Sequence, residues 1–337
     1  MKIDGFLLAM LGAIVLSLIA PGLGTPAGPL HMGLVTTLGI GLVFLLHGAN
    51  LSPDALKAGA TNWRIHAAVQ GSTFVLFPLI GFAIFFGLQS VLSYEVRLGL
   101  FFLCALPSTI SSSVAMTSMA RGNVPAAVFD ASFSGIIGMV ITPMLIATVV
   151  AVGGKPFPVL PAIADIAMTL LLPFAVGQVM RPLIARWLMA NKRVINLLDR
   201  GVIVLIVYSA FCESTASGLW WNYSPWVIGE IALIAAALLA LVLSITAAVA
   251  RAWGFSLPDE VTTVFCGSKK SLANGAPIAK ILFAGSPALG MIMLPIILYH
   301  QLQLIVCSVL ARRYAARAAG AAEHAGKSAE PMRTKFN

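Results

Sequence analysis

Two consecutive lysines, Lys269 and Lys270, lie inside a long apolar stretch, within a polar run at residues 267–275. Each lysine placed in the middle of a membrane helix costs at least about 2.5–3.5 kcal/mol on insertion, and such residues face an aqueous cavity or an anionic partner. The pair therefore indicates either a binding site for an anionic substrate or a positive charge in the place of a coupling cation. The alternative is a structural salt bridge to Asp130 or Glu213.

A second polar run, at residues 107–115, occupies the corresponding place in the first half of the chain. Both runs contain helix-breaking residues, Pro107 and Gly267, and backbone groups freed at a break inside a bilayer need a protein or water partner. Interrupted helices at matching positions mark the binding site of many secondary transporters, although hydroxyl groups can also simply hold packed helices together. The candidate residues for substrate or ion binding are Thr73, Ser108, Thr109, Ser111, Ser112, Ser113, Asp130, Ser132, Ser134, Ser268, Lys269, Lys270, Ser271 and Asn274.

Asp130 is the natural counter-charge for the lysines, because it lies in the helix that follows the first polar run. It could also be a carboxylate coupled to proton movement, if burial favours its protonated form. The four cysteines lie in apolar runs without paired spacing, a pattern that predicts neither a disulfide nor a metal site. No second carboxylate at matching depth, Ser–His arrangement or His-Glu-x-x-His motif accompanies these residues, so we predict no catalytic residues.

The composition identifies the solvent of this chain. Of its 337 residues, 59% are hydrophobic and only 10% are charged, and the mean hydropathy is +0.95. A soluble domain carries about 25% charged residues, so the composition excludes a soluble globular, a disordered and a disulfide-rich secreted protein. A net charge of +9 without a soluble domain to present it does not indicate nucleic-acid binding. The chain is predicted to be an all-α polytopic membrane protein whose main partner is the lipid bilayer.

Apolar runs of about 20 residues predict transmembrane helices. Ten are expected, near residues 5–20, 33–51, 65–88, 98–120, 124–150, 160–180, 200–219, 226–253, 260–283 and 287–311. Lysines and arginines concentrate on the side of the membrane that both termini share, so the positive-inside rule predicts that both termini are cytoplasmic.

The two halves of the chain resemble each other. The run at residues 138–143 matches the run at residues 290–295, and each follows the polar run of its half. Because five helices is an odd number, the second repeat enters the membrane inverted. We expect a first five-helix repeat at residues 1–152, a second, inverted five-helix repeat at 153–314, and a disordered cytoplasmic tail at 315–337.

Several runs carry a family resemblance. Residues 120–124, together with the polar break in the ninth helix, resemble the bile acid:sodium symporter superfamily, and residues 44–49, 73–78 and 264–275 are more closely similar to its bacterial sodium/bile acid cotransporter 7-like branch. The resemblance covers about residues 1–315. It implies a panel of helices 1, 2, 6 and 7 that rocks against a core of helices 3, 4, 5, 8, 9 and 10, with broken helices 4 and 9 crossing at the site. It also implies a place in the bacterial inner (plasma) membrane.

In bile-acid-transporting members, the resemblance implies two sodium ions held by hydroxyls, amides and a glutamate of helix 9, and Ser113 matches one sodium-site serine. The departures are Val114 in place of a ligand asparagine, Ala127 and Ala131 in place of hydroxyl residues, Phe265 in place of the glutamate and Lys269 in place of a glutamine. A neighbouring ammonium group opposes sodium binding electrostatically. We therefore expect a lysine charge to replace the bound cation, so that transport is independent of sodium or differently coupled.

Possible sodium coupling stays open, because Ser132, Ser134 and Asn274 could offer oxygen ligands elsewhere. The leading interpretation is a secondary transporter that moves a small organic anion by alternating access and needs no organic cofactor. One alternative is a regulatory membrane protein of the 7-like branch, acting in ion or calcium homeostasis without moving an organic anion. A further alternative is an enzyme acting inside the membrane.

Overall fold

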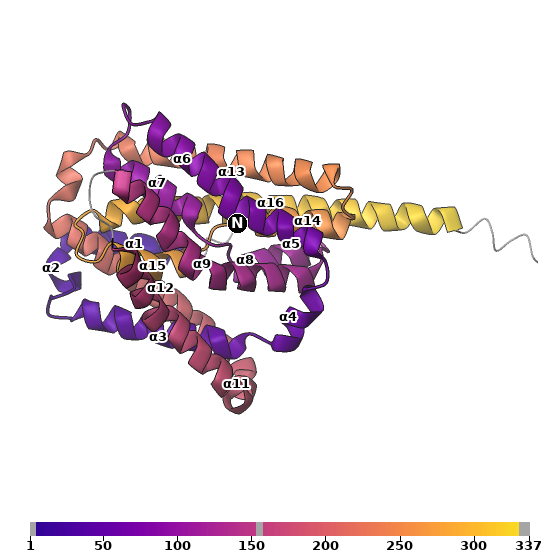
Figure 1. The fold of residues 1–337 in the computed structure, drawn as a ribbon, viewed down its shortest axis with the longest axis horizontal. Helices are drawn as coiled ribbons and strands as arrows, with labels where there is room; N and C mark the ends of the chain where they lie inside the picture. Colours follow the sequence, from indigo (N-terminus) through magenta and orange to yellow (C-terminus); the bar gives the residue numbers. More distant parts are fainter. Residues whose placement is uncertain (1–4, 153–157, 330–337) are drawn as a thin grey trace, which may run out of the picture.

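The computed structural model describes residues 5–152 and 158–329, and these residues form helices and connecting turns without any strand. Figure 1 shows the helices gathered into one bundle. In chain order they are α1 (Gly5–Ile19), α2 (Pro21–Gly24), α3 (Met32–Asn50), α4 (Pro53–Gly59), α5 (Trp63–Gly71), η1 (Ser72–Leu76), α6 (Phe77–Gly87), α7 (Tyr94–Ala105), α8 (Ser111–Met119), α9 (Val124–Val152), α10 (Val159–Ile166), η2 (Ala167–Leu171), α11 (Leu172–Ala190), α12 (Lys192–Ala216), η3 (Leu219–Asn222), α13 (Trp226–Ala252), α14 (Leu257–Ser268), α15 (Leu272–Leu282) and α16 (Leu289–Ala329).

Seven helical segments among the described residues are long and apolar enough to cross a membrane, and α1 is a shorter apolar helix. The seven are Met32–Asn50, Trp63–Gly87, Val124–Ala151, Val159–Ala190, Lys192–Ala216, Trp226–Ala252 and Leu289–Gly320. The chain is therefore a polytopic all-α membrane protein. The arrangement of ten spans as two inverted repeats stays a prediction, and its boundary after residue 152 falls at residues 153–157, which lie outside the described part.

Two of the expected spans are interrupted where the sequence predicts helix breaks. The fourth is divided into α7 and α8 by residues 106–110, and the ninth is divided into α14 and α15 by residues 269–271. Pro107 has no N–H to continue the ladder of α7. The new helix after the second break begins at Leu272. The residue before it, Ser271, accepts a hydrogen bond on its side chain from the N–H of Asn274 and so caps α15.

Two further spans widen into a π-helical turn just before a proline. The turn η1 precedes Pro78 in α6, and η2 precedes Pro173 in α11. In η1 the N–H of Phe77 bonds to the carbonyl of Ser72, five residues back, instead of to that of Thr73. A proline cannot supply the next N–H, so a wider turn at this place leaves one carbonyl of the span without a helical partner.

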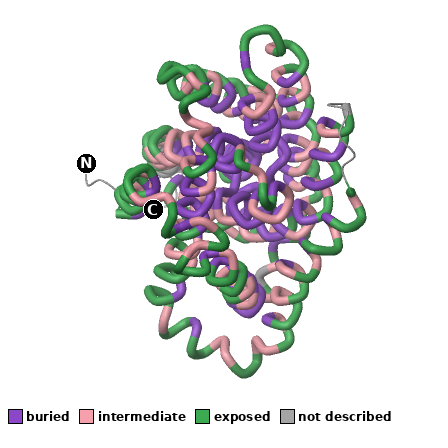
Figure 2. The backbone as a smooth tube through the Cα atoms, turned by 90° about the vertical axis from the view of Figure 1, so that its left-hand side faces the viewer, coloured by how far each residue is buried: buried purple, intermediate pink, exposed green. Residues whose placement is uncertain are grey.

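The helices differ strongly in how much of their surface other helices cover. Of the most apolar 18-residue window in each span, 56% of α9 is buried but only 11% of the α10–α11 segment. In Figure 2 the buried parts of the chain gather in the middle of the bundle and exposed parts surround them. The span α9 therefore belongs to the interior, while α10 and α11 lie largely against lipid.

The helices α3 and α11 pack against each other through glycines. A side chain at Gly48 would meet the backbone carbonyl of Phe174, and one at Gly177 would meet that of Leu45. Small residues allow such close backbone approach between membrane helices. The side chain of Gln178 adds a hydrogen bond of 3.0 Å to the carbonyl of Leu51.

The last helix extends farther than the sequence analysis predicts. A disordered tail is expected from residue 315, but α16 stays helical to Ala329, and Figure 1 shows its end projecting beyond the bundle. Residues 315–329 are rich in alanine, the strongest helix former, and they continue a helix that is already nucleated. Residues 330–337 of the predicted tail lie outside the described part.

Candidate functional site

The two broken helices meet at their breaks. The backbone N–H of Ser271 donates to the carbonyl of Pro107 at 2.9 Å. The hydroxyl of Ser108 donates to the carbonyl of Cys266 at 2.6 Å, and its backbone N–H donates to Oγ of Ser134 at 2.9 Å. The structure therefore brings the two polar runs into direct contact, and α9 joins them through Ser134.

The carboxyl-terminal end of α14 is held by hydroxyl groups from four different segments. The last carbonyls of a helix have no partner within it, and here each of the last four accepts a side-chain hydroxyl. The pairs are Ser113 with Phe265 at 3.2 Å, Ser108 with Cys266 at 2.6 Å, Ser72 with Gly267 at 2.7 Å and Tyr299 with Ser268 at 2.7 Å. These hydroxyls from four segments therefore fix the end of α14 at the break in the ninth span.

The ammonium group of Lys270 lies among three backbone carbonyls. Its Nζ is 3.0 Å from the carbonyl oxygen of Thr73, 2.8 Å from that of Cys104 and 2.6 Å from that of Leu106. The carbonyl of Thr73 is available because the N–H of Phe77 bonds to the carbonyl of Ser72 instead, and Pro78 has no N–H. The carbonyls of Cys104 and Leu106 are available because α7 ends there.

Three acceptors use all three N–H donors of an ammonium group, so Lys270 has none left for a substrate. The residue is fully buried, and its Nζ also lies 4.1 Å from the centre of the Phe77 ring, a cation–π contact. The carboxyl-terminal end of α7 adds the negative end of its helix dipole. This arrangement of converging carbonyl oxygens around one positive charge resembles a cation site whose cation is covalently attached to the chain.

Lys269 is held less completely. Its Nζ donates to the carbonyl of Ser112 at 2.8 Å and lies 5.3 Å from the centre of the Phe265 ring. The hydroxyl of Ser112 itself is 3.4 Å from that of Thr109. Since one carbonyl uses only one of the three ammonium donors, Lys269 keeps the capacity to bind a further acceptor.

The structure excludes, among the described residues, the alternative of a structural salt bridge between the lysines and Asp130 or Glu213. Neither lysine pairs with a carboxylate among the described residues; the fully buried Asp130 instead binds His66, with Oδ1 and Nδ1 3.0 Å apart. Gln70 donates to the same Oδ1 at 3.2 Å. The physical reason is that the carbonyls freed at the breaks already supply the partial negative charge that a carboxylate was expected to provide.

Other predicted site residues differ in how closely they take part. Ser271 caps α15, and Ser268 donates its hydroxyl to the carbonyl of Val264 at 2.6 Å. Asn274 is buried near the crossing, on the first turn of α15. Ser132 is buried without a hydrogen-bond partner for its hydroxyl, and Ser111 is exposed at the start of α8. Within the described residues, no group of three or more His, Cys, Asp or Glu residues could hold a metal ion.

Sequence reasoning missed two residues of α16 that hold the second break. Gln303 accepts from the backbone N–H of Lys270 and donates to its carbonyl, both at 2.9 Å. Tyr299 donates to the carbonyl of Ser268. The two residues are four positions apart and therefore share one face of the helix. Two polar side chains on one face of an apolar helix are the signal that could have identified them.

A second polar site lies between α12 and the α15–α16 segment. A cavity of about 110 Å³ is lined by Glu213, Lys280, Ser209 and Pro26, among others. The ammonium of Lys280 donates to the carbonyl of Gly33 at 3.1 Å. One carboxylate and one ammonium thus border a small cavity at the end of α12 away from Lys192. Glu213, which the sequence analysis offered as a counter-charge for Lys269 and Lys270, belongs to this cavity.

The sequence of this chain is similar to those of known membrane proteins. The profile of the SBF-like CPA transporter family matches residues 4–316. The uncharacterized protein PA2026 of Pseudomonas aeruginosa is 47% identical over 315 residues, which cover 93% of each chain. YfeH of Escherichia coli, which is named a symporter, is 42% identical over 314 residues, again 93% of each. The sodium/bile acid cotransporter 7 of Rattus norvegicus is 28% identical over 311 residues, 91% of each chain.

Proposed function

Because this chain belongs to the SBF-like CPA transporter family, and is a membrane transporter and not an enzyme, we propose that it moves a small organic anion by alternating access. In this proposal the ammonium of Lys270 takes the place of a coupling cation, so that transport does not depend on sodium. The cotransporter 7 relatives carry sodium in their names, which makes possible sodium coupling the feature to test.

The proposed architecture is the one that the resemblance implies. Ten spans form two inverted repeats, with α1, α3, the α10–α11 segment and α12 as the panel and the other spans as the core. Support comes from the two breaks, which interrupt the fourth and ninth spans and contact each other through Ser271 and Pro107. With relatives in two bacteria, we place the protein in the bacterial inner membrane with both termini in the cytoplasm.

One observation carries the sodium-independent mechanism: the three carbonyl oxygens within 3.0 Å of Nζ of Lys270. Hard cations such as sodium are bound by oxygen ligands of this kind. A sodium ion in this position would have to displace a buried ammonium group and then lie beside it. A sodium ion and an ammonium group about 4 Å apart repel each other by about 4 kcal/mol in a medium with an effective dielectric constant of about 20.

The proposed anion site combines Lys269 with the amino-terminal end of α8. The residue before this helix, Ile110, provides no side-chain cap, so the first N–H groups of α8 are available to an anion. Exposed Ser111 and half-buried Ser112 lie there, and the carbonyl of Ser112 holds the ammonium of Lys269. The ammonium of Lys269, which is fully buried, lies beside the first turn of α8, and we infer that it and the N–H groups at the start of this helix together attract a carboxylate-bearing solute.

The cavity next to Glu213 and Lys280, of about 110 Å³, lies between α12 of the proposed panel and α15 of the proposed core. Relative movement of the two would change its volume. Its lining does not include Lys269, Ser111 or Ser112, so its volume sets no limit on the size of the solute bound at the proposed anion site.

The test begins with a set of small carboxylates added to the purified protein in detergent. A ligand that binds the folded state raises the melting temperature in a concentration-dependent way. Each carboxylate that does so is then measured for uptake into proteoliposomes, with a sodium gradient and with choline in its place. We expect equal uptake in the two media, at least tenfold slower uptake by Lys269→Gln, and normal uptake by the control Lys57→Gln, which changes an exposed lysine.

Two results would overturn parts of the proposal separately. Uptake that stops when choline replaces sodium removes the sodium-independent mechanism. Unchanged uptake by Lys269→Gln removes that residue from the anion site. A purified, folded protein that binds and moves no organic anion would favour the regulatory alternative.

A further inference from the structure

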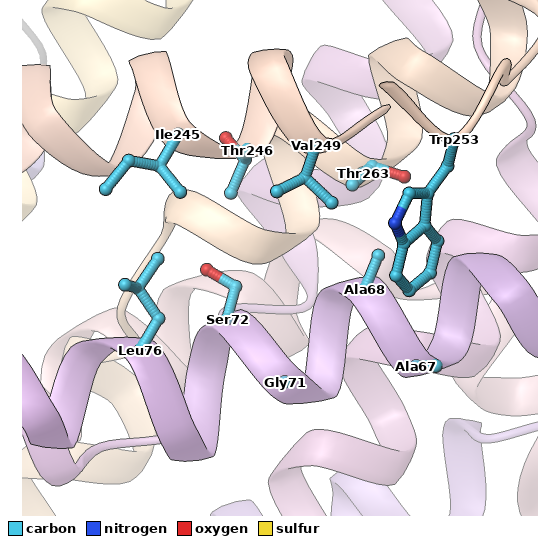
Figure 3. Close-up of a pocket in the computed structure, with 10 residues that line it drawn as sticks. All are labelled: Ala67, Ala68, Gly71, Ser72, Leu76, Ile245, Thr246, Val249, Trp253 and Thr263. Atoms are coloured by element: carbon cyan, nitrogen blue, oxygen red, sulfur yellow. The ribbon is translucent and has the colours of Figure 1, made fainter. Parts of the chain in front are cut away.

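A crevice opens on the outside of the bundle between α5–η1 and α13. Figure 3 shows the side chains of both segments pointing into it, with Thr263 of α14 behind. Its volume is about 260 Å³, and apolar groups such as Ala68, Leu76 and Val249 make up much of its lining. It lies on two spans that cross the membrane, so the medium outside its mouth is lipid.

The crevice is suited to hydrocarbon. An apolar cavity of this kind does not hold ordered water, which needs two to four polar partners. Gly71 lies in the wall, and a side chain added there would have no atom within 4 Å. The empty space in front of Gly71 is therefore wide enough for a chain of methylene groups. Trp253, which is 41% exposed, forms one end of the crevice.

A positive charge stands at that same end. The guanidinium of Arg64 donates to the backbone carbonyl of Trp253 and lies 5.4 Å from the centre of the Phe255 ring. One carbonyl uses only one or two of its five N–H donors, so the others can bind a phosphate. Trp63, also at the start of α5, is 71% exposed. Tryptophan and arginine together are typical of the membrane–water interface.

A buried polar atom without a partner gives an independent indication of a ligand. The hydroxyl of Thr263 has no hydrogen-bond partner, although the residue is fully buried and lines the crevice. In Figure 3 Thr263 lies next to Trp253, the residue whose backbone carbonyl accepts a hydrogen bond from Arg64. An ester carbonyl there would accept its hydrogen bond, as would be expected just below a phosphate group.

We propose that the crevice binds one molecule of an anionic phospholipid, with an acyl chain along Gly71, an ester carbonyl at Thr263 and the phosphate at Arg64. The site borders the break in the ninth span. Ser72, in its wall, donates to the carbonyl of Gly267 at 2.7 Å. A side chain on Gly267 would meet Thr246, from the opposite wall, at 3.2 Å. A bound acyl chain therefore packs against the groups that fix the end of α14.

The experiment uses native mass spectrometry of the purified full-length protein with added dioleoyl phosphatidylglycerol or dioleoyl phosphatidylcholine. Gly71→Leu fills the crevice. Gly229→Leu, at an exposed position near the start of α13 and outside the lining of the crevice, is the matched control because a side chain there also has no atom within 4 Å. We expect one retained phosphatidylglycerol, bound several-fold more tightly than phosphatidylcholine. Gly71→Leu should weaken its binding at least tenfold, and Gly229→Leu should leave it unchanged.

Arg64→Gln is the second variant, and it tests the head-group contact without filling the crevice. It should abolish the preference for phosphatidylglycerol. Equal retention of phosphatidylglycerol by Gly71→Leu and the unmodified protein would overturn the proposal, and so would equal loss in both glycine variants. Unaltered preference in Arg64→Gln would show that the phosphate binds elsewhere and would overturn the assigned site. None of these outcomes depends on the transported substrate.

Discussion

Replacing Lys270 by methionine removes the charge from the carbonyl cluster while nearly keeping the length of the side chain. The carbonyls of Thr73, Cys104 and Leu106 then lose the ammonium that lies 2.6–3.0 Å from them. A buried acceptor left without a partner costs about 1–3 kcal/mol. With three such acceptors, we expect Lys270→Met to lower the free energy of unfolding by at least about 3 kcal/mol.

The assay is a thermal melt in detergent with choline as the only monovalent cation. Lys280→Met is the control, because Lys280 is only partly buried and its ammonium donates to one backbone carbonyl, that of Gly33, at 3.1 Å. We expect a clear loss of stability for Lys270→Met and a smaller one for the control. Equal melting temperatures for the two variants would refute the reasoning, because the three-carbonyl contact would then contribute nothing of its own.

The same variant also reports what the carbonyl cluster prefers to bind. If the ammonium of Lys270 occupies a cation position, sodium should partly restore the stability of Lys270→Met. A ligand at 100 times its dissociation constant contributes about 2.7 kcal/mol. Restoration by sodium but not by choline at equal ionic strength supports a true cation position. The absence of any difference between the two salts would show that the cluster is only a structural anchor for the lysine.

Three further predictions concern stability in the same melts. Gln303→Leu should lower the free energy of unfolding by about 2–4 kcal/mol, because it leaves the buried N–H and carbonyl of Lys270 without their partners; an unchanged melt would contradict this. Asp130→Asn and Lys270→Met should have additive effects within about 0.5 kcal/mol, since the two residues form no ion pair; a larger coupling would reveal a shared network. Gly48→Ala should destabilise the protein by about 1–3 kcal/mol or more, because its methyl group meets backbone; Gly41→Ala, where the nearest atom is 4.0 Å away, should melt normally.

The approximate places of the two breaks could be predicted because the chain marks the first with a proline and the second with charged residues at a depth where lipid cannot solvate them. Pro107 has no N–H, and two lysines in an apolar run imply a special environment. The membrane character followed from composition alone. The hydrophobic pattern and the composition of a segment reflect its local structure, so they predict the positions of helices and helix breaks well.

The partners of the lysines could not be predicted, because a backbone carbonyl has no signature in the sequence. Charge complementarity directed attention to Asp130, whereas the structure satisfies Lys270 with the freed ends of two other spans. In retrospect Pro78 was an available signal, since a proline in a span always frees a carbonyl upstream of it. The position of that carbonyl next to Lys270 depends on packing between distant segments.

The roles of His66 and Gln303 were missed for a related reason. Each has polar neighbours in its own helix, Arg64 and Gln70 for His66 and Gln301 for Gln303, and nothing in the sequence shows which of these polar residues contacts the site. Their roles depend on tertiary contacts. His66 lies 3.0 Å from Asp130, and Gln303 forms hydrogen bonds with both the N–H and the carbonyl of Lys270. The extension of α16 was missed because an alanine-rich tail has low hydrophobicity yet high helix propensity.

The central claim, a lysine charge in place of the coupling cation, is tested most directly on the unmodified protein. Its melting temperature is measured in detergent while sodium replaces choline at constant ionic strength. We predict no saturable shift, because the ammonium of Lys270 already occupies the carbonyl cluster. A saturable, sodium-specific rise in melting temperature would reveal a sodium site in the folded protein and would contradict the account.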